Sequence, residues 1–485
     1  MGADAPAVVH VTALHGGGVD RHVRSVARSV ARPHWFWHAG ASADVLENPA
    51  DSRTYVLDRS RLAKASDALR ARRVGVIHLH STARPSRAIA ARLALDLAAR
   101  TIVTLHDVLF LRADAFEEGD PLQPDPAWLA EMEPVLRDAA AVLAPSDFIA
   151  GLAREHFPGL EVSVVPNGSI HAGPRALAPR AEFAARRPKH VVAVTGAIGP
   201  HKGSDILEEL PAHLEGSDIG IVVVGYLDRQ LFPGWRVPGR LFIHGAWADA
   251  DATGLLEAYG ARLVLFPNRV PESFSYALSD AWAAGLPVLA TRQGALAERI
   301  ERHGGGWLLP ADADAATIAR ELRRLFEGDE IARVQSTLSR QDPARLPPLE
   351  DMARSLEALY RRFAIDPAAP ADADARDLEH LVTANLDGSL FRTELIRLSD
   401  EYAQLAAALE DERGRFAQFQ SEAREWIAKL EADVKTLSAS LEIEVEERRC
   451  LGQEIVQLQI HKDAFDRLPD LVRRYLLKKT LDARN

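Results

Sequence analysis

Residues 261–294 read ARLVLFPNRVPESFSYALSDAWAAGLPVLATRQG, and this stretch decides the fold. Two short apolar runs, 261–267 and 287–291, flank a segment, 274–284, whose apolar residues recur at helical spacing. The Pro-Glu-Ser triplet at 271–273 has the composition of a helix start. Strand, helix and strand in this order predict two parallel strands joined by a crossover helix.

The same alternation runs through the first three-quarters of the chain. Further strands are expected at 8–14, 34–40, 54–58, 75–80, 101–106, 141–146, 161–166, 190–198, 220–226 and 240–245. Helical spacing lies between them, as at 21–31, 86–99 and 127–139. Near-continuous apolar strands separated by helices predict parallel sheets covered on both faces. We therefore expect an α/β fold of two doubly wound, Rossmann-like domains, 1–172 and 173–364, with a ligand site in the cleft between them.

Composition excludes several classes of protein. At 485 residues, the chain should form two to four units. A net charge of −11 argues against a nucleic-acid-coating protein, which needs concentrated positive charge. A single cysteine, Cys450, excludes an intramolecular disulfide and a multi-thiolate zinc site. Because neither a secretion signal nor an apolar run of membrane-spanning length is apparent, we expect a cytoplasmic protein.

The last quarter of the chain differs in kind. Residues 365–376 are rich in Pro, Ala and Asp and predict a linker. From 377 to 464 apolar residues step by three and four, which predicts a long coiled coil and therefore a homo-oligomer; a helical hairpin folded back on the body is the alternative. The tail, 465–485, is basic and amphipathic. It can end the coiled coil, pack on a partner, or lie on the anionic inner face of the cell membrane.

Three motifs place chemistry-bearing residues at strand ends. Gly17 and Gly18 follow the first strand, where they can form a plain tight turn or cradle an anion at a helix N-terminus. His106 ends the strand TIVTLHD; a lone histidine is usually structural, but here it could bond a sugar hydroxyl or move a proton. Gly196 and Lys202 lie in and after a strand-to-helix loop, where lysine can hold a diphosphate.

A pair of acids frames the helix in the opening stretch. Glu272 lies at the helix mouth, and Asp280 is eight residues further, roughly 12 Å along the axis. A ligand with a sugar at one end and a ribose at the other needs acceptors at two such points, and the helix N-terminus between them favours phosphate. Each acid taken alone would be an ordinary solvated residue.

Together these motifs resemble the retaining, nucleotide-sugar-dependent glycosyltransferases of the GT-B fold, in the large family 4 (group 1). The resemblance covers roughly residues 7–364. It is carried by the acid-x7-acid helix and by HGGGVD, TLHD, APS at 144–146, VPNG at 165–168 and GAIGPHKG, in that order.

The resemblance implies three catalytic residues. His106 would line the acceptor side near the reacting centre, Lys202 would bind the donor diphosphate, and Glu272 would accept hydrogen bonds from the donor sugar. It also implies that the base lies at the HGAW loop, the ribose on the second acid, and phosphate on backbone N–H groups at the helix start. The implied donor-binding residues are Gly17, Gly18, Gly196, Lys202, Ala246, Trp247, Glu272, Phe274, Ser275 and Asp280.

The chain departs from the family pattern at three of these places. Asp280 stands where the family usually has Glu, Ala197 where it has Arg, and Ser275 where it has Gly. His201 is a candidate to replace part of the missing arginine's contact with the diphosphate.

The implied function is transfer of a sugar, with retained configuration, from a nucleotide diphosphate sugar to a saccharide or lipid-linked acceptor. Cell-surface polysaccharide synthesis of the O-antigen or capsule type is the expected setting, with no metal and no cofactor. The alternative is an inactive transferase-like body that serves as a coiled-coil scaffold in a polysaccharide assembly complex. A sugar-nucleotide epimerase of the same fold is a further alternative.

Overall fold

The computed structural model describes residues 5–13, 17–40, 44–50, 53–57, 62–115, 120–169, 176–338 and 342–365. The linker beyond Ile365, the coiled coil at 377–464 and the tail at 465–485 lie outside the described residues and remain predictions. Among the described helices, none combines the length and apolar composition needed to span a bilayer.

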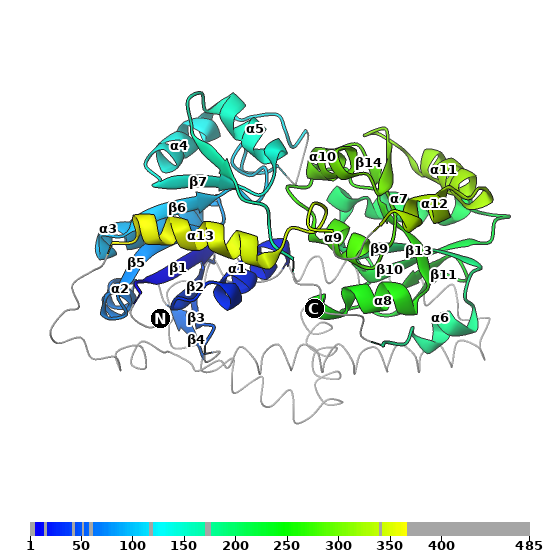
Figure 1. Cartoon of the computed structure of the whole chain (residues 1–485), viewed down its shortest axis with the longest axis horizontal. Coiled ribbons are helices and arrows are strands. Elements are labelled where there is room, and N and C mark those ends of the chain that lie inside the picture. Colours follow the sequence, from blue (N-terminus) through cyan, green and yellow to red (C-terminus); the bar gives the residue numbers. More distant parts are fainter. Residues whose placement is uncertain are drawn as a thin grey trace, which may run out of the picture. The chain divides into compact units, whose positions relative to one another are not determined.

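The first domain is built on an eight-stranded sheet in the order β4-β3-β2-β1-β5-β6-β7-β8 (Figure 1). Its strands are β1 Ala7–Thr12, β2 His34–His38, β3 Asp44–Asn48, β4 Arg53–Leu57, β5 Val74–Leu79, β6 Arg100–Thr104, β7 Ala141–Ala144 and β8 Val162–Val164. The helices between them are α1 Gly17–Ser29, α2 Leu62–Ala71, α3 Arg84–Leu97, α4 Pro126–Arg137 and α5 Asp147–His156.

The second domain is built on a seven-stranded sheet in the order β11-β12-β10-β9-β13-β14-β15. Its strands are β9 His190–Ile198, β10 Ile219–Leu227, β11 Gly234–Val237, β12 Leu241–Ile243, β13 Ala261–Phe266, β14 Val288–Thr291 and β15 Gly306–Leu309. Its helices are α6 Ala181–Ala185, η2 Pro200–Lys202, α7 Ser204–His213, η3 Asp249–Asp251, α8 Ala252–Ala258, α9 Tyr276–Ala283, α10 Gly294–His303, α11 Ala315–Glu327 and α12 Glu330–Ser336.

The expected α/β fold of two wound sheets is confirmed, and the expectation of purely parallel sheets is wrong at two edges. β3 and β4 pair antiparallel with their neighbours, and so does β11 with β12. The five residues between β2 and β3 are too few for a crossover helix, so the chain turns back as a hairpin. The sequence analysis did not identify β3, β11 or β15 as strands.

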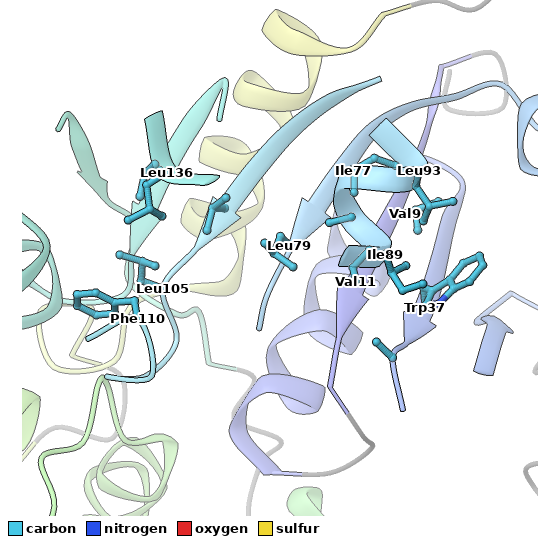
Figure 2. Packing of buried hydrophobic residues seen from close by; sticks show 14 of the residues in the cluster. Val9, Val11, Trp37, Ile77, Leu79, Ile89, Leu93, Leu105, Phe110 and Leu136 are labelled. Carbon is cyan, nitrogen blue, oxygen red and sulfur yellow. The ribbon is translucent and has the colours of Figure 1, made fainter. Parts of the chain in front are cut away.

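Side-chain alternation along the strands sorts the first domain's core into two layers. Val9 of β1 and Ile77 of β5 belong to the cluster under α2 and α3, where Ile89 and Leu93 reach toward Trp37 (Figure 2). Their chain neighbours Val8, Val76 and Ile102 belong to the cluster on the opposite face. Burial on both faces explains why apolar residues lie on both faces of these strands.

The last described helix, α13 Leu349–Phe363, returns to the first sheet (Figure 1). Its Met352, Leu356 and Tyr360 pack with Val8 and Val26. The guanidinium of Arg32 forms an ion pair with Glu357, 2.7 Å from Nε to Oε2. Residues 349–363, which the sequence analysis grouped with the second domain, are therefore part of the first domain's core.

Candidate active site

Lys202 and Glu272 lie side by side in the second domain. Lys202 ends η2, directly after β9, and its Nζ is 3.1 Å from Oε1 of Glu272. Asn268, just beyond β13, donates to the same oxygen through Nδ2 at 3.1 Å. The two charged side chains keep 30% and 21% of their surface exposed, so a ligand can reach both.

Two glycines allow the backbone to bring this pair together. Gly203 follows Lys202 with φ of +79°, and a Cβ there would lie 2.3 Å from the carbonyl oxygen of Pro267. Gly294 has φ of +54°, and a Cβ there would lie 2.6 Å from the carbonyl oxygen of Glu272. That carbonyl accepts a 2.8 Å hydrogen bond from the N–H of Ala295. Close backbone approach of this kind requires glycine.

Asp280, the second acid, is held by a residue of the first domain. Nη1 and Nη2 of Arg21 donate to its two carboxylate oxygens at 2.7 and 2.8 Å. The guanidinium carbon of Arg21 lies 4.5 Å from the centre of the Tyr276 ring. The ion pair raises the pKa of Arg21, although burial alone would lower it. The sequence analysis did not select Arg21, because its partner is 259 residues away.

A buried arginine, Arg299, forms hydrogen bonds with residues at the start of α9. Nη1 of Arg299 donates to the carbonyl oxygens of Phe274 and Ser275, both at 2.9 Å, and its Nη2 donates to Ser279 at 2.9 Å. Burial lowers the pKa of Arg299 to about 9. Within the described residues, no hydrogen bond uses the backbone N–H of Phe274 or Ser275, so both donors are available to an anion.

The remaining donor-side residues lie at the ends of their strands. Gly196 pairs with Gly225 across β9 and β10, and Trp247 lies so close to Gly225 that a Cβ there would be 3.0 Å from its ring. Trp247 is half-buried and Ala246 is exposed.

The two first-domain glycines begin α1. Gly17 adopts φ of +71° with open space around its Cα, and a Cβ on Gly18 would lie 3.7 Å from the Tyr276 ring. This glycine turn therefore lies beside α9 of the second domain.

His106 lies just beyond β6 and is 8% exposed. Its carbonyl oxygen accepts a hydrogen bond from the hydroxyl of Ser273, the residue next to Glu272. The segments that carry His106 and Glu272 therefore meet at the junction of the two domains.

A set of buried histidines extends from His106 into the first domain. Ring nitrogens are separated by 2.9 Å between His34 and His10, between His10 and His80, and between His80 and His106. The rings of His22 and His106 also contact each other, with centres 4.6 Å apart. The trio His22, His80 and His106 brings nitrogens within 4.8 Å of one another, and so does a second trio of His10, His78 and His80.

The sequence analysis missed this set, although a signal was present. The segments VVHVT, HWFWH, VIHLH and VTLH of four neighbouring strands each carry histidine, and where a segment has two they are separated by two or four residues. An even separation puts these side chains on one face of the sheet, the face covered by α1 and α13.

Further contacts between the domains surround α5. The carboxylate of Glu298 accepts hydrogen bonds from the N–H of Phe148, at 2.7 Å, and of Asp147, at 3.3 Å, at the N-terminus of α5. Arg302 forms an ion pair of 2.6 Å with Asp147. A cavity of ≈ 370 Å³ lies beside these contacts and is lined by Pro145, Phe274, Arg299 and Met352, among others. Lys202, Glu272 and Asp280 do not line it.

Two family models match successive parts of the chain. The model of the glycosyl transferase 4-like domain matches residues 3–168, and that of the glycosyl transferases group 1 matches residues 189–328. A lipopolysaccharide 1,2-N-acetylglucosaminetransferase of Salmonella typhimurium is 28% identical over 219 residues, which are 41% of this chain and 56% of the relative. The chain thus spans about half the length of this curated relative.

Solved structures share the fold. HepE of Anabaena, crystallised with UDP and glucose, superposes with a TM-score of 0.56 at 14% identity, over 74% of this chain and 100% of that one. Sucrose-phosphate synthase of Thermosynechococcus elongatus gives 0.55 at 17% identity, over 74% and 98%. At such low identities the likeness concerns the two-domain GT-B fold alone. The two family models follow each other in order and together match more than half of the chain, so the protein belongs to the glycosyltransferase group 1 family.

Proposed function

We propose that this protein is a retaining glycosyltransferase that moves a sugar from a nucleotide diphosphate sugar to a saccharide or lipid-linked saccharide. The observation that carries the proposal is the pair of Lys202 and Glu272 at the carboxyl ends of β9 and β13, 3.1 Å apart and both open to a ligand. One donor molecule can therefore contact a cation through its phosphate and a carboxylate through its sugar.

The donor diphosphate would meet positive groups of the protein itself. Lys202 supplies a point charge, and the unused N–H groups of Phe274 and Ser275 supply the positive end of α9. These groups stabilise the charge that grows on the leaving diphosphate, and we propose that no metal and no cofactor is needed. In the retaining route that we propose, the leaving phosphate itself receives the proton of the acceptor hydroxyl.

The nucleotide would extend from this point toward Asp280 and Trp247. Asp280 offers two carboxylate oxygens to a ribose, once the bond to Arg21 is exchanged. Trp247 and Ala246 offer a partly exposed surface to the base. Two similar proteins favour this interpretation, because the Salmonella relative is a lipopolysaccharide N-acetylglucosaminetransferase and HepE was crystallised with UDP and glucose. We propose cell-surface polysaccharide synthesis at the cytoplasmic side as the setting.

Transfer from a panel of nucleotide sugars tests the proposal. The purified chain should release one nucleoside diphosphate in the presence of a lipid-linked or oligosaccharide acceptor, and the product anomer, read by NMR, should match the donor. Glu272→Ala should abolish this release. The matched control is Glu301→Ala, because Glu301 is 53% exposed on α10 and forms an ion pair with the exposed Arg292.

Two results would reject the proposal. Near-normal transfer by Glu272→Ala would reject the site. The absence of both transfer and thermal stabilisation by any nucleoside diphosphate would favour the scaffold role instead, because a ligand that binds only the folded state must raise its melting temperature.

The C-terminal region would determine whether copies of the chain associate and whether they contact a membrane. We propose that residues 377–464 join copies of this chain as a coiled coil and that the tail, 465–485, can contact membrane. Light scattering of the full chain should give a multiple of 53.0 kDa. A mass of one chain would reject self-association.

A further inference from the structure

Four buried histidines form one continuous row of hydrogen bonds across four strands. His34 of β2, His10 of β1, His80 after β5 and His106 after β6 are joined in this order, each ring-to-ring contact 2.9 Å long. At its far end, Nε2 of His34 lies 3.1 Å from the carbonyl oxygen of Val30. At its near end lies His106, the residue expected beside the reacting sugar.

The carbonyl of Val30 fixes the direction of every bond in the row. A carbonyl oxygen only accepts, so Nε2 of His34 must carry a proton. A neutral imidazole carries one ring proton, so Nδ1 of His34 accepts, and Nε2 of His10 must donate to it.

The same step repeats twice along the row. Nδ1 of His10 accepts from Nε2 of His80, and Nδ1 of His80 accepts from Nε2 of His106. His106 is therefore left with its proton on Nε2 and a bare lone pair on Nδ1. Within the described residues, that Nδ1 forms no hydrogen bond.

These bond directions hold for neutral rings, and the surroundings of the four histidines keep them neutral. All four are at most 8% exposed. Burial, and then repulsion by neighbouring histidines, lowers the pKa of His10 and of His80. Burial likewise lowers the pKa of His34 to about 4 and lowers that of His106. The imidazoles are consequently uncharged near neutral pH.

We propose that His34, His10 and His80 are positioning residues that lock His106 in its Nε2–H tautomer, so that its Nδ1 accepts a hydrogen bond from the attacking hydroxyl of the acceptor sugar. The hydroxyl has one proton, which points at Nδ1 while the acceptor binds and so orients the oxygen toward the donor. In the transfer step the oxygen forms its bond to the sugar, and the same proton leaves Nδ1 for the departing phosphate, so that His106 ends the step neutral. The fixed tautomer of His106 does not depend on the reaction, whereas its hydrogen bond to the acceptor hydroxyl rests on the proposed glycosyl transfer.

His78 provides a matched control inside the same layer. It is fully buried, and its ring nitrogens bond the hydroxyls of Tyr360 and Thr104, each at 2.7 Å. Its ring centre is 3.9 Å from that of His80, yet no hydrogen bond of the row passes through it. Loss of His78 thus removes two buried hydrogen bonds and leaves the row intact.

NMR of the full chain, with ¹⁵N in the histidine rings, tests the lock directly. Nitrogens joined by an N–H···N bond share a scalar coupling, and one-bond proton couplings report which nitrogen is protonated. We expect couplings for His34–His10, His10–His80 and His80–His106, with the His106 proton on Nε2. The variant H34F should leave His106 in two tautomers, H34Q should restore one because an amide can both donate and accept, and H78F should change none.

Kinetic measurements then test whether the fixed tautomer of His106 contributes to sugar transfer. H34F should lower kcat at least tenfold and change KM for the donor less than twofold, while H34Q and H78F retain most of the activity. Three results in the wild-type spectra would refute the fixed tautomer of His106. They are the absence of a coupling between His80 and His106, a proton on Nδ1 of His106, and binding of these rings to a copurified metal. If the wild type shows the couplings but H34F keeps the wild-type kcat, the fixed tautomer of His106 has no role in transfer. If the chain transfers no sugar at all, the spectra of the unmodified protein still decide whether the lock exists.

Discussion

Arg21 of α1 and Asp280 of α9 form a two-pronged ion pair, 2.7 and 2.8 Å long, that joins the two domains across the expected nucleotide position. Both side chains are largely buried, with 15% and 8% of their surface exposed. A nucleotide ribose that binds Asp280 must therefore displace Arg21. The guanidinium released in this way remains beside the glycine turn, where the donor phosphates are expected.

The losses of stability caused by removing the two partners should not add. Arg21→Met or Asp280→Asn leaves a buried polar group unpaired and should lower the free energy of unfolding by about 3 kcal/mol. The double variant should lose clearly less than the sum of the two. Urea unfolding of the four proteins measures the coupling energy.

An exposed pair between the same two domains is the control. Arg302 and Asp147 are 52% and 53% exposed, and their coupling should stay below about 1 kcal/mol. Additive losses within about 0.5 kcal/mol at Arg21 and Asp280 would contradict the described pair.

Gly203→Ala should damage the site as well as the fold. Gly203 and Gly216 have nearly equal positive φ angles, 79° and 75°, but only at Gly203 would a Cβ meet backbone, 2.3 Å from Pro267 O. Each Gly→Ala substitution should lower the free energy of unfolding by about 1–2 kcal/mol, because alanine disfavours the left-handed conformation. Gly203→Ala should lose more, and should also weaken nucleotide binding because Lys202 must shift. Calorimetric melting and nucleotide titration of both variants check this; equal losses would show that the close contact does not exist.

Ser275 is in a strained conformation, so Ser275→Gly should not destabilise the protein. Its φ is +67°, a value that favours glycine, while its hydroxyl caps α9 by accepting from the N–H of Leu278 at 3.3 Å. Glycine relieves the strain and loses only a few tenths of a kcal/mol of capping. Ser275→Ala keeps the strain and loses the cap, and should be destabilised by about 1 kcal/mol. A lower melting temperature for Ser275→Gly than for Ser275→Ala would refute this explanation.

The buried histidines should make the protein sensitive to acid. Burial lowers the pKa of His22 to about 4, from an ordinary value of 6.5. Between these two pH values the unfolded chain binds the proton that the folded chain excludes. Stability is therefore complete above pH 6.5 and falls as the pH drops toward 4.

His22→Leu isolates one contribution to this acid sensitivity. Both ring nitrogens of His22 are buried, and the effect of burial on its pKa exceeds the opposing effect of the Asn167 side chain. The variant should keep its stability at pH 7.5 and lose less than the wild type between pH 6.5 and 4, measured by urea unfolding at each pH. An unchanged pH slope would show that His22 does not titrate as described.

Most strands of the two sheets could be predicted from the sequence, because an apolar run is a local pattern, whereas β3, β11 and β15 could not. Lys202 and Glu272 were identified by their positions after apolar strands, and β9 lies where the apolar run predicted it. The partnership of Arg21 with Asp280 was not predictable, since it depends on the placement of two domains. The strand β3, DVLEN, lacks a clear apolar alternation, and its pairing follows only from the hairpin with β2.

The histidine row was missed for a different reason. Histidine counts as polar in a pattern of alternation, yet here the rings satisfy one another, and the face that carries them is buried under α1 and α13. A strand that is apolar on one face and histidine-bearing on the other looks like a fully buried strand.

The proposed function depends above all on Lys202 binding the phosphates of a nucleotide. Calorimetric titration of the unmodified chain, Lys202→Met and Lys189→Met with the nucleoside diphosphate that stabilises the wild type tests it most directly. Lys189 has 70% of its surface exposed and lies 3.9 Å from Asp218, so it serves as a control of equal charge. We expect the Kd to rise at least tenfold in Lys202→Met and to remain unchanged in Lys189→Met. Equal affinity of Lys202→Met and the wild type would contradict the account.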